Sequence, residues 1–312
     1  MLQALPLRVW NATPREDARI KPVRVFRAAA LTVKGPPMTD FGPAGASRAR
    51  EPIFSIPAVV VVLVGLLLAI HGGLTYFGAA AQDAAYRDWA FIPGRLTITV
   101  WPSRLGEVLA RINDSRAALE QAMLIRHFNV LNGGAKVWTL ATYALLHGSW
   151  AHVGVNCIWL VAFGPPIARR FGALRFLLFF GTTAVAGALA HWALTPMDFT
   201  PLIGASAADS GLMAAAARFV FQPGAPLGAR RGYGAASSGS WGYAPAASLA
   251  QVLTDRRALI FIAIWMATNF VFGAGAQTLG ASEAPVAWVA HVGGFLAGLL
   301  LFPLFDSHSR RV

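Results

Sequence analysis

The sequence predicts an all-α polytopic membrane protein, a bundle of six transmembrane helices with both termini in the cytoplasm. Three observations lead to this fold class. The 312 residues are 56% hydrophobic and only 13% charged, about half the charged share of a soluble domain. Six stretches are mostly apolar, and most of them reach the ~20 residues that a spanning helix needs. The Lys and Arg residues are sorted to alternate ends of these stretches, as expected for a multi-span protein.

The predicted spans divide the chain into a tail and one membrane domain. Residues 1–54 hold nine basic and four acidic residues with scattered Pro and Gly, which indicates a mostly disordered cytoplasmic tail; we expect Met38 as an alternative start. The membrane domain covers residues 55–305, and residues 306–312 form a second cytoplasmic tail. The six predicted spans are 55–77, 140–163, 173–194, 206–221, 258–279 and 284–305.

Two long connections interrupt this domain. The outer loop, 78–138, contains a helical spacing of apolar residues from Ser103 to Leu119, typical of a helix that lies on the membrane or packs on the outer ends of the spans. The inside linker, 222–257, is rich in Gly, Ala, Ser and Pro, which predicts a flexible segment.

The distribution of basic residues sets the orientation. With the N-terminus inside, 19 of the 26 Lys and Arg fall in cytoplasmic segments, and the short outer loops hold none. The other seven lie in the long outer loop, which has little weight in the positive-inside rule. Because the basic residues flank spans and form no single patch, the sequence excludes nucleic acid as a partner and indicates the lipid bilayer. A single cysteine, Cys157, excludes an intrachain disulfide and so a secreted disulfide scaffold.

Polar residues inside predicted spans are the candidates for function, since burying them in a bilayer is costly. The second span has His147, His152 and Asn156. The fourth has Ser206 and Ser210 and is preceded by Gly204. The sixth has His291, followed by Gly294 and Gly298. His152 and Asn156 are four residues apart and share a helix face. His147 is rotated by about 140° from His152 if the helix includes it, so we expect it to form a hydrogen bond at the outer end of this helix.

Spacing and depth predict that these groups meet. The fourth span is short, so its N-terminus at Ser206 should lie below the outer surface, next to an irregular stretch that needs a water-filled cavity or a protein environment. His291 and His152 should reach a similar depth. Gly294 and Gly298 form a small-xxx-small face that permits close helix contact, and this contact would bring His291 to Ser206.

The chemistry of such a group is that of an activated nucleophile. A serine hydrogen-bonded to a histidine can attack a carbonyl carbon. Free N–H groups at a helix N-terminus, together with His152 and Asn156, can stabilise the developing oxyanion. No carboxylate is well placed to orient His291, so the sequence predicts a catalytic dyad. No cofactor and no metal are expected.

The order of these motifs resembles the bacterial-type rhomboid intramembrane serine proteases. The resemblance rests on His147-x4-His152-x3-Asn156, Gly204-x-Ser206 and His291-x2-Gly294-x3-Gly298, and covers residues 54–305. It implies Ser206 as nucleophile, His291 as general base, and His152, Asn156 and the Ser206 amide as oxyanion hole. Gly204, His147, Gly294 and Gly298 would support them. It also implies that the fifth span, with Trp265 and Asn269, borders the entry route of a substrate helix.

The sequence departs from the family pattern at two positions. Ala207 stands where the family has Gly after the serine, and Trp138-Thr139 stands where the family has Trp-Arg. Ala is small enough to keep close packing, so we expect activity to survive, whereas the loss of the Arg affects the rigidity of the first loop. Ser210, followed by Gly211, is a rival nucleophile.

Three functions stay open at this point. The leading one is an endopeptidase that cleaves transmembrane protein substrates near their outer ends, in a bacterial inner membrane with its active site toward the outer face. The second is a catalytically inactive adaptor of the same fold that binds transmembrane helices. The third is a metal-dependent enzyme or transporter that uses the histidines, which the divergence of His147 and His152 disfavours.

Overall fold

The computed structural model describes residues 56–107, 134–222, 225, 245–271 and 287–306. Within these ranges the chain is helical and has no strand, only an isolated antiparallel bridge between Phe91 and Leu202. The predicted all-α class is therefore confirmed. The expected N-terminal tail and most of the expected helix at Ser103–Leu119 lie outside the described residues.

The elements are α1 (Ala58–Phe77), α2 (Ala79–Trp89), α3 (Pro93–Val100), η1 (Pro102–Arg104), α6 (Thr139–Thr142), η2 (Tyr143–Leu145), α7 (Trp150–Phe171), α8 (Ala173–Leu194), α9 (Ser206–Ala217), α10 (Leu249–Thr254), α11 (Arg256–Phe270) and α13 (Trp288–Phe305).

Four of the described helices, α1, α7, α8 and α13, are long and apolar enough to cross a membrane. The bounds of α8 are those predicted, and α9 begins at Ser206 as expected. The remaining two candidates are shorter within the described residues, since α9 has 12 residues and α11 has 15. The count of six spans and their orientation therefore stay predictions.

The second predicted span is wrong in its bounds. Residues 139–145 form the short α6 and η2, and the long helix α7 begins only at Trp150 and continues to Phe171. Ser149 caps this helix, because its Oγ accepts a hydrogen bond from the His152 amide at 3.1 Å. The apolar run before Gly148 suggested one continuous helix, but the cap sets the true start. His147 consequently precedes α7, and its predicted rotation about the helix axis does not apply.

The inside linker also differs from the prediction at its C-terminal end. Ser248 and Gln251 form a reciprocal capping box that starts α10. Asp255 then caps α11 by accepting from the amides of Arg257 and Ala258. From Leu249 on, this segment consists of two capped helices joined at Asp255, and local polar side chains satisfy the first amides of each helix.

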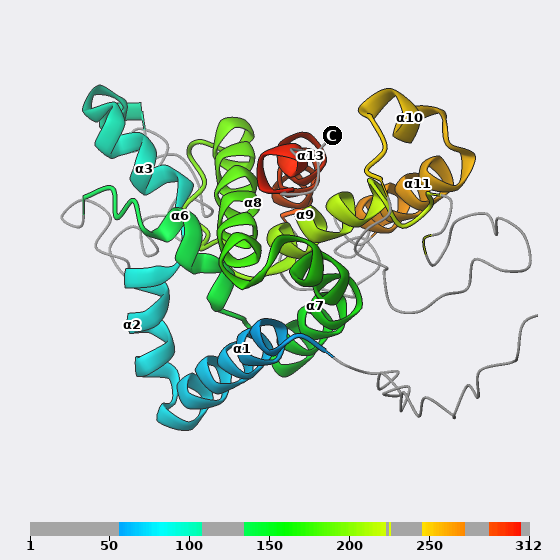
Figure 1. Ribbon diagram of the computed structural model, residues 1–312. Helices are drawn as coiled ribbons and strands as arrows, with labels where there is room; N and C mark the ends of the chain where they lie inside the picture. The colour runs from blue at the N-terminus through cyan, green and yellow to red at the C-terminus, as the bar shows by residue number, and fades with distance from the viewer. Residues whose placement is uncertain (1–55, 108–133, 223–224, 226–244, 272–286, 307–312) are drawn as a thin grey trace, which may run out of the picture. The chain divides into compact units, whose positions relative to one another are not determined.

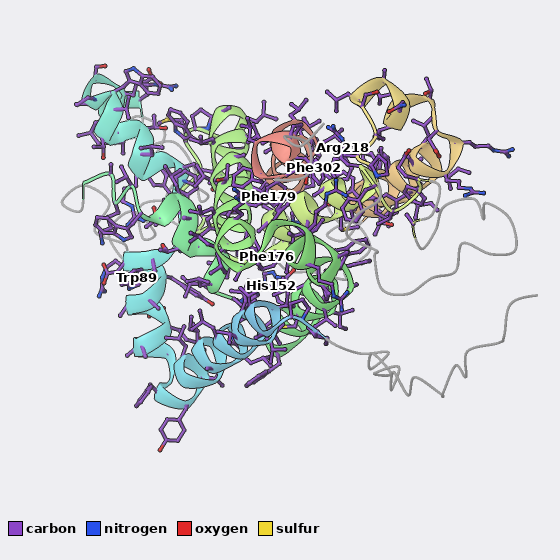
Figure 2. The ribbon with its side chains drawn as sticks, viewed as in Figure 1. Trp89, His152, Phe176, Phe179, Arg218 and Phe302 are labelled. Carbon is purple, nitrogen blue, oxygen red and sulfur yellow. The ribbon has the colours of Figure 1, made fainter. Side chains whose placement is uncertain are left out.

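The helix α9 lies at the centre of the packing. Residues 207–217 are all buried, and α9 contacts α7, α8 and α13, while α13 also packs along α8 (Figure 1). Arg218, the residue that follows α9, was expected to flank a span at the membrane surface. It is buried instead, and its guanidinium donates to the carbonyls of Ala247 and Leu299. Its guanidinium lies 5.4 Å from the ring centroid of Phe302 (Figure 2). A short central helix surrounded by long ones places its first residue, Ser206, inside the protein.

Candidate active site

The irregular stretch before α9 is held by the segment between α2 and α3. Leu202 and Phe91 exchange both backbone hydrogen bonds, at 2.7 and 3.3 Å. The amide of Gly204 donates to the carbonyl of Tyr143 at 3.0 Å, and Gly204 has a φ of 114°, which L side chains rarely adopt. These bonds satisfy the backbone where it lacks helix partners and direct the chain into α9 at Ser206.

Two glycines of α13 bring that helix against α9. A Cβ on Gly294 would overlap the carbonyl oxygen of Ala207, and a Cβ on Gly298 would overlap that of Gly211. The expected small-xxx-small face therefore makes a backbone-to-backbone contact that no larger residue permits. His291, one turn before Gly294, comes to lie beside the first residue of α9.

The imidazole of His291 contacts two side chains. Its Nε2 lies 2.7 Å from the Oγ of Ser206, and its Nδ1 lies 2.6 Å from the Oδ1 of Asn269 on α11. All three residues are partly buried. Ser210, the rival nucleophile, is buried instead and donates its hydroxyl to the Ser206 carbonyl at 2.7 Å. The histidine thus faces Ser206, and Ser210 has a local helix bond.

His152 and Asn156 approach the same place from α7 (His152 is labelled in Figure 2). A Cβ on Gly204, two residues before Ser206, would lie 2.6 Å from the Nε2 of His152 and 3.6 Å from the Nδ2 of Asn156. Asn156 is 2% exposed, and among the described residues its Nδ2 has no hydrogen-bond partner. A buried donor without an acceptor is costly, so this amide is available for an oxygen atom that the site would bind.

The backbone at the start of α9 adds further donors. No side chain from the described part of the chain caps this helix, and its N-cap position is Ala205. The first amides of a helix lack partners within it and carry the positive end of the helix dipole. The amide of Ser206 is thus a candidate donor at the start of α9.

His147 supports this region from outside the helix. Its Nε2 accepts a long hydrogen bond, 3.4 Å, from the Ala205 amide, and its ring lies edge-on to that of His152 with centroids 5.0 Å apart. Its carbonyl accepts from Tyr86 and lies 3.1 Å from the Nδ1 of His71 on α1. His147 is 2% exposed. It joins α1, α2 and the turn before α9, as a structural hydrogen-bonding residue would.

Comparison with protein families shows which family the chain belongs to. The Rhomboid domain model matches residues 134–306, more than half of the chain. The chain belongs to the rhomboid family. Together with the four long apolar helices, this membership makes it a multi-pass membrane protein. Within the described residues, no three His, Cys, Asp or Glu side chains gather as a metal site would require.

Two proteins of Bacillus subtilis (strain 168) are similar over part of this rhomboid. "Putative rhomboid protease YdcA" is 33% identical over 86 residues, which are 28% of this chain and 42% of that protein. "Rhomboid protease GluP" is 32% identical over 87 residues, 28% of this chain and 17% of that protein. The matched region thus spans less than half of either relative.

The two departures from the family pattern have local explanations in this rhomboid. A Cβ on Gly187 of α8 would lie 2.6 Å from the Cβ of Ala207, so the methyl group of Ala207 occupies space that Gly187 leaves open. In the first loop, Thr139 is buried and donates to the Lys136 carbonyl at 2.6 Å. The ammonium group of Lys136 lies 2.6 Å from the carboxylate of Asp88 on α2. This ion pair ties the loop to α2.

The contact that Asn269 makes with His291 was not predicted from the sequence. The resemblance implies that the fifth span, which contains Asn269, borders the entry route of a substrate helix, and the sequence predicts a dyad because no carboxylate is well placed to orient His291. In the structure Asn269 faces His291 directly. An amide carbonyl accepts a hydrogen bond from an imidazole N–H as a carboxylate does. The available signal in the sequence was a polar side chain in an apolar helix.

Proposed function

We propose that this rhomboid is an intramembrane serine endopeptidase that hydrolyses peptide bonds of transmembrane protein substrates, with Ser206 as nucleophile and His291 as general base. The observation that carries the proposal is the 2.7 Å contact between the Nε2 of His291 and the Oγ of Ser206. This distance is within the reach required of a nucleophile and its base. The family match and the names of the partial relatives support the same activity.

The reaction follows the logic of acyl transfer by serine. His291 takes the hydroxyl proton as Oγ bonds to the substrate carbonyl carbon, and the carbonyl electron pair moves to oxygen. The protonated His291 then gives that proton to the leaving amine as the C–N bond breaks, which leaves an ester on Ser206. Water attacks this ester with His291 again as base, and the acid product departs with Ser206 restored.

The oxyanion is assigned to donors that converge near Gly204. His152, Asn156 and the Ser206 amide come from two different elements, and the unpartnered Nδ2 of Asn156 is the most specific support for this role. Fixed donors of this kind stabilise charge that develops only in the transition state. His147, Gly204, Gly294 and Gly298 have supporting roles, since they set backbone positions around these groups.

The setting of the reaction follows from the predicted topology. Six spans with both termini inside would open the site toward the outer face of a bacterial inner membrane, and the substrates would be cut near the outer ends of their spans. The alternative is an inactive adaptor that binds transmembrane helices. Retention of the Ser206–His291 contact favours the enzyme, because binding alone does not require a base aligned on a hydroxyl.

The test uses the full chain purified in detergent and a serine-directed fluorophosphonate. We expect labelling of the wild type and of Ser210→Ala, and none of Ser206→Ala or His291→Gln. Cleavage of a model transmembrane substrate should follow the same pattern and persist with a chelator present. Labelling that survives in Ser206→Ala would refute the nucleophile assignment. Chelator-sensitive cleavage would favour a metal enzyme, and a chain that neither labels nor cleaves would favour the adaptor.

A further inference from the structure

The second contact of His291 is as short as its first. The Oδ1 of Asn269 lies 2.6 Å from the Nδ1 of His291, on the side of the imidazole away from Ser206. Asn269 belongs to α11 and His291 to α13, and these two helices touch at few places. Hydrogen bonds of Asn side chains are one of the interactions that hold membrane helices together, so this bond both contacts the imidazole and fixes α11 against α13.

The orientation of the Asn269 amide follows from its other bond. Its Nδ2 donates to the carbonyl of Trp265, one turn earlier in α11, at 3.0 Å. The carbonyl end of the amide therefore points toward His291, and a carbonyl oxygen can only accept a hydrogen bond. Nδ1 of His291 must then carry a hydrogen. In the neutral imidazole, this leaves the lone pair on Nε2, directed at the Ser206 hydroxyl.

An aromatic stack fixes the two helices at the required separation. Trp265 is 7% exposed and stacks on Phe295, with ring centroids 4.2 Å apart and an interplanar angle of 21°. Trp265 and Asn269 are four residues apart on α11, and His291 and Phe295 are four apart on α13. The stack and the hydrogen bond are therefore successive contacts, one turn apart, between the same two helices.

We propose that Asn269 is a positioning residue that holds His291 in the Nδ1–H tautomer, so that the site works as a Ser206–His291–Asn269 triad. This rests on the proposed protease function. Asn269 does not touch the reacting atoms and acts through His291. A wrong tautomer presents an N–H to the serine hydroxyl and cannot remove its proton.

Three variants separate the acceptor from the rest of the side chain. Asn269→Leu removes both hydrogen bonds, and Asn269→Asp keeps an acceptor for His291 while losing the donor to Trp265. Thr268→Val is the matched control, because Thr268 is exposed and its hydroxyl donates within its own helix to the Ile264 carbonyl at 2.8 Å. The fluorophosphonate labelling rate of Ser206 is the first readout, since the small probe does not depend on entry of a substrate helix.

We expect Asn269→Leu to label about 10-fold or more slowly, and Asn269→Asp and Thr268→Val to label within about threefold of wild type. With a peptide substrate, Asn269→Leu should lower kcat and leave KM nearly unchanged. Wild-type labelling by Asn269→Leu would overturn the proposal. Equal loss in the Leu and Asp variants would also overturn it, since the acceptor would then be irrelevant.

A second readout needs no activity. Nitrogen-15 NMR of histidine-labelled protein, with the His291 signal assigned by its loss in His291→Gln among the seven histidines, should show the Nδ1–H tautomer in wild type and Asn269→Asp. Asn269→Leu should show a mixture or the Nε2–H form. If Ser206 never labels, the protease proposal fails, and the tautomer measurement still decides the role of Asn269. An unchanged tautomer in Asn269→Leu would refute it.

Discussion

The guanidinium of Arg170 and the carboxylate of Asp306 form a two-point ion pair in the interior of the protein. Nε lies 3.1 Å from Oδ1 and Nη2 lies 2.7 Å from Oδ2, and both side chains are 2% exposed or less. Arg170 also lies over the rings of Phe219 and Phe302. The pair joins the C-terminal turn of α7 to the residue that ends α13, and α13 carries His291.

Loss of this ion pair should destabilise the folded protein. We expect Asp306→Ala to lower the free energy of unfolding by about 3–5 kcal/mol, because a buried guanidinium loses its bidentate partner. Thermal unfolding in detergent measures the effect. Glu107→Ala, which removes the exposed pair with Arg104, serves as control and should change stability by less than about 1 kcal/mol. Equal, small effects of both changes would contradict a structural role for the buried pair.

Gly298 should not tolerate a methyl group. Gly298→Ala should destabilise the protein by about 1–3 kcal/mol and reduce activity, because the added Cβ overlaps the Gly211 carbonyl and forces α13 away from α9. The added Cβ of Gly65→Ala in α1 meets no atom of the described part of the chain within 4 Å, so this change should be neutral or slightly stabilising, since Ala is the better helix former. Thermal unfolding and substrate cleavage of the two variants test this contrast. A stable, active Gly298→Ala variant would contradict the requirement for a close contact between α13 and α9.

Gly204 should be required for both conformation and space. Gly204→Ala should reduce cleavage strongly, because its φ of 114° is strained for Ala and the new methyl group would meet the His152 ring at 2.6 Å. Gly134→Ala separates the two causes, since Gly134 also has a positive φ, 61°, but an added Cβ there meets no atom of the described residues within 4 Å. Activity should survive there. Comparable activity in both variants would remove Gly204 from the site.

The ion pair between Lys136 and Asp88 should make the connection between α1 and α7 sensitive to acid. The hydrogen bond from Lys136 holds the pKa of Asp88 below its ordinary value of 3.8. A lowered pKa in the folded state contributes stability above the ordinary value and loses it as the pH falls through the lowered one. The gain is small, at most about 1 kcal/mol, because Asp88 is nearly half exposed.

Comparison of Lys136→Met with wild type tests this linkage. The difference in melting temperature between the two proteins should be largest near neutral pH and shrink as the pH falls below 3.8. Arg104→Met, which breaks an exposed pair in η1, is the control and should leave the loop unaffected. A difference that grows on acidification would reverse the sign and exclude the ion pair as its cause.

Much of the fold and of the candidate site was predictable because apolar length, charge sorting and small-residue spacing are local properties of the chain. The bounds of α8, the start of α9 and the contact face of Gly294 and Gly298 follow from them. The start of α7 was misplaced because a one-residue cap, Ser149, outweighs an apolar run. The end of α7 at Phe171 could not be foreseen either, since Arg170 looks like a membrane flank until Asp306 is brought beside it, whereas α13 ends at residue 305 as predicted. The bond between Asn269 and His291 depends on how α11 meets α13, which no spacing within either helix encodes.

The separation of Ser206 and His291 in the chain, 85 residues, has a consequence for biosynthesis. Because the ribosome makes α9 well before α13, a growing chain carries the serine into the membrane while its base has yet to be translated. Under the proposed mechanism, such a chain is inert toward its neighbours at the translocon. Hydrolytic competence would arise in one step, when α13 inserts and its two glycines seat against α9, so that synthesis itself delays proteolysis until the helix bundle is assembled.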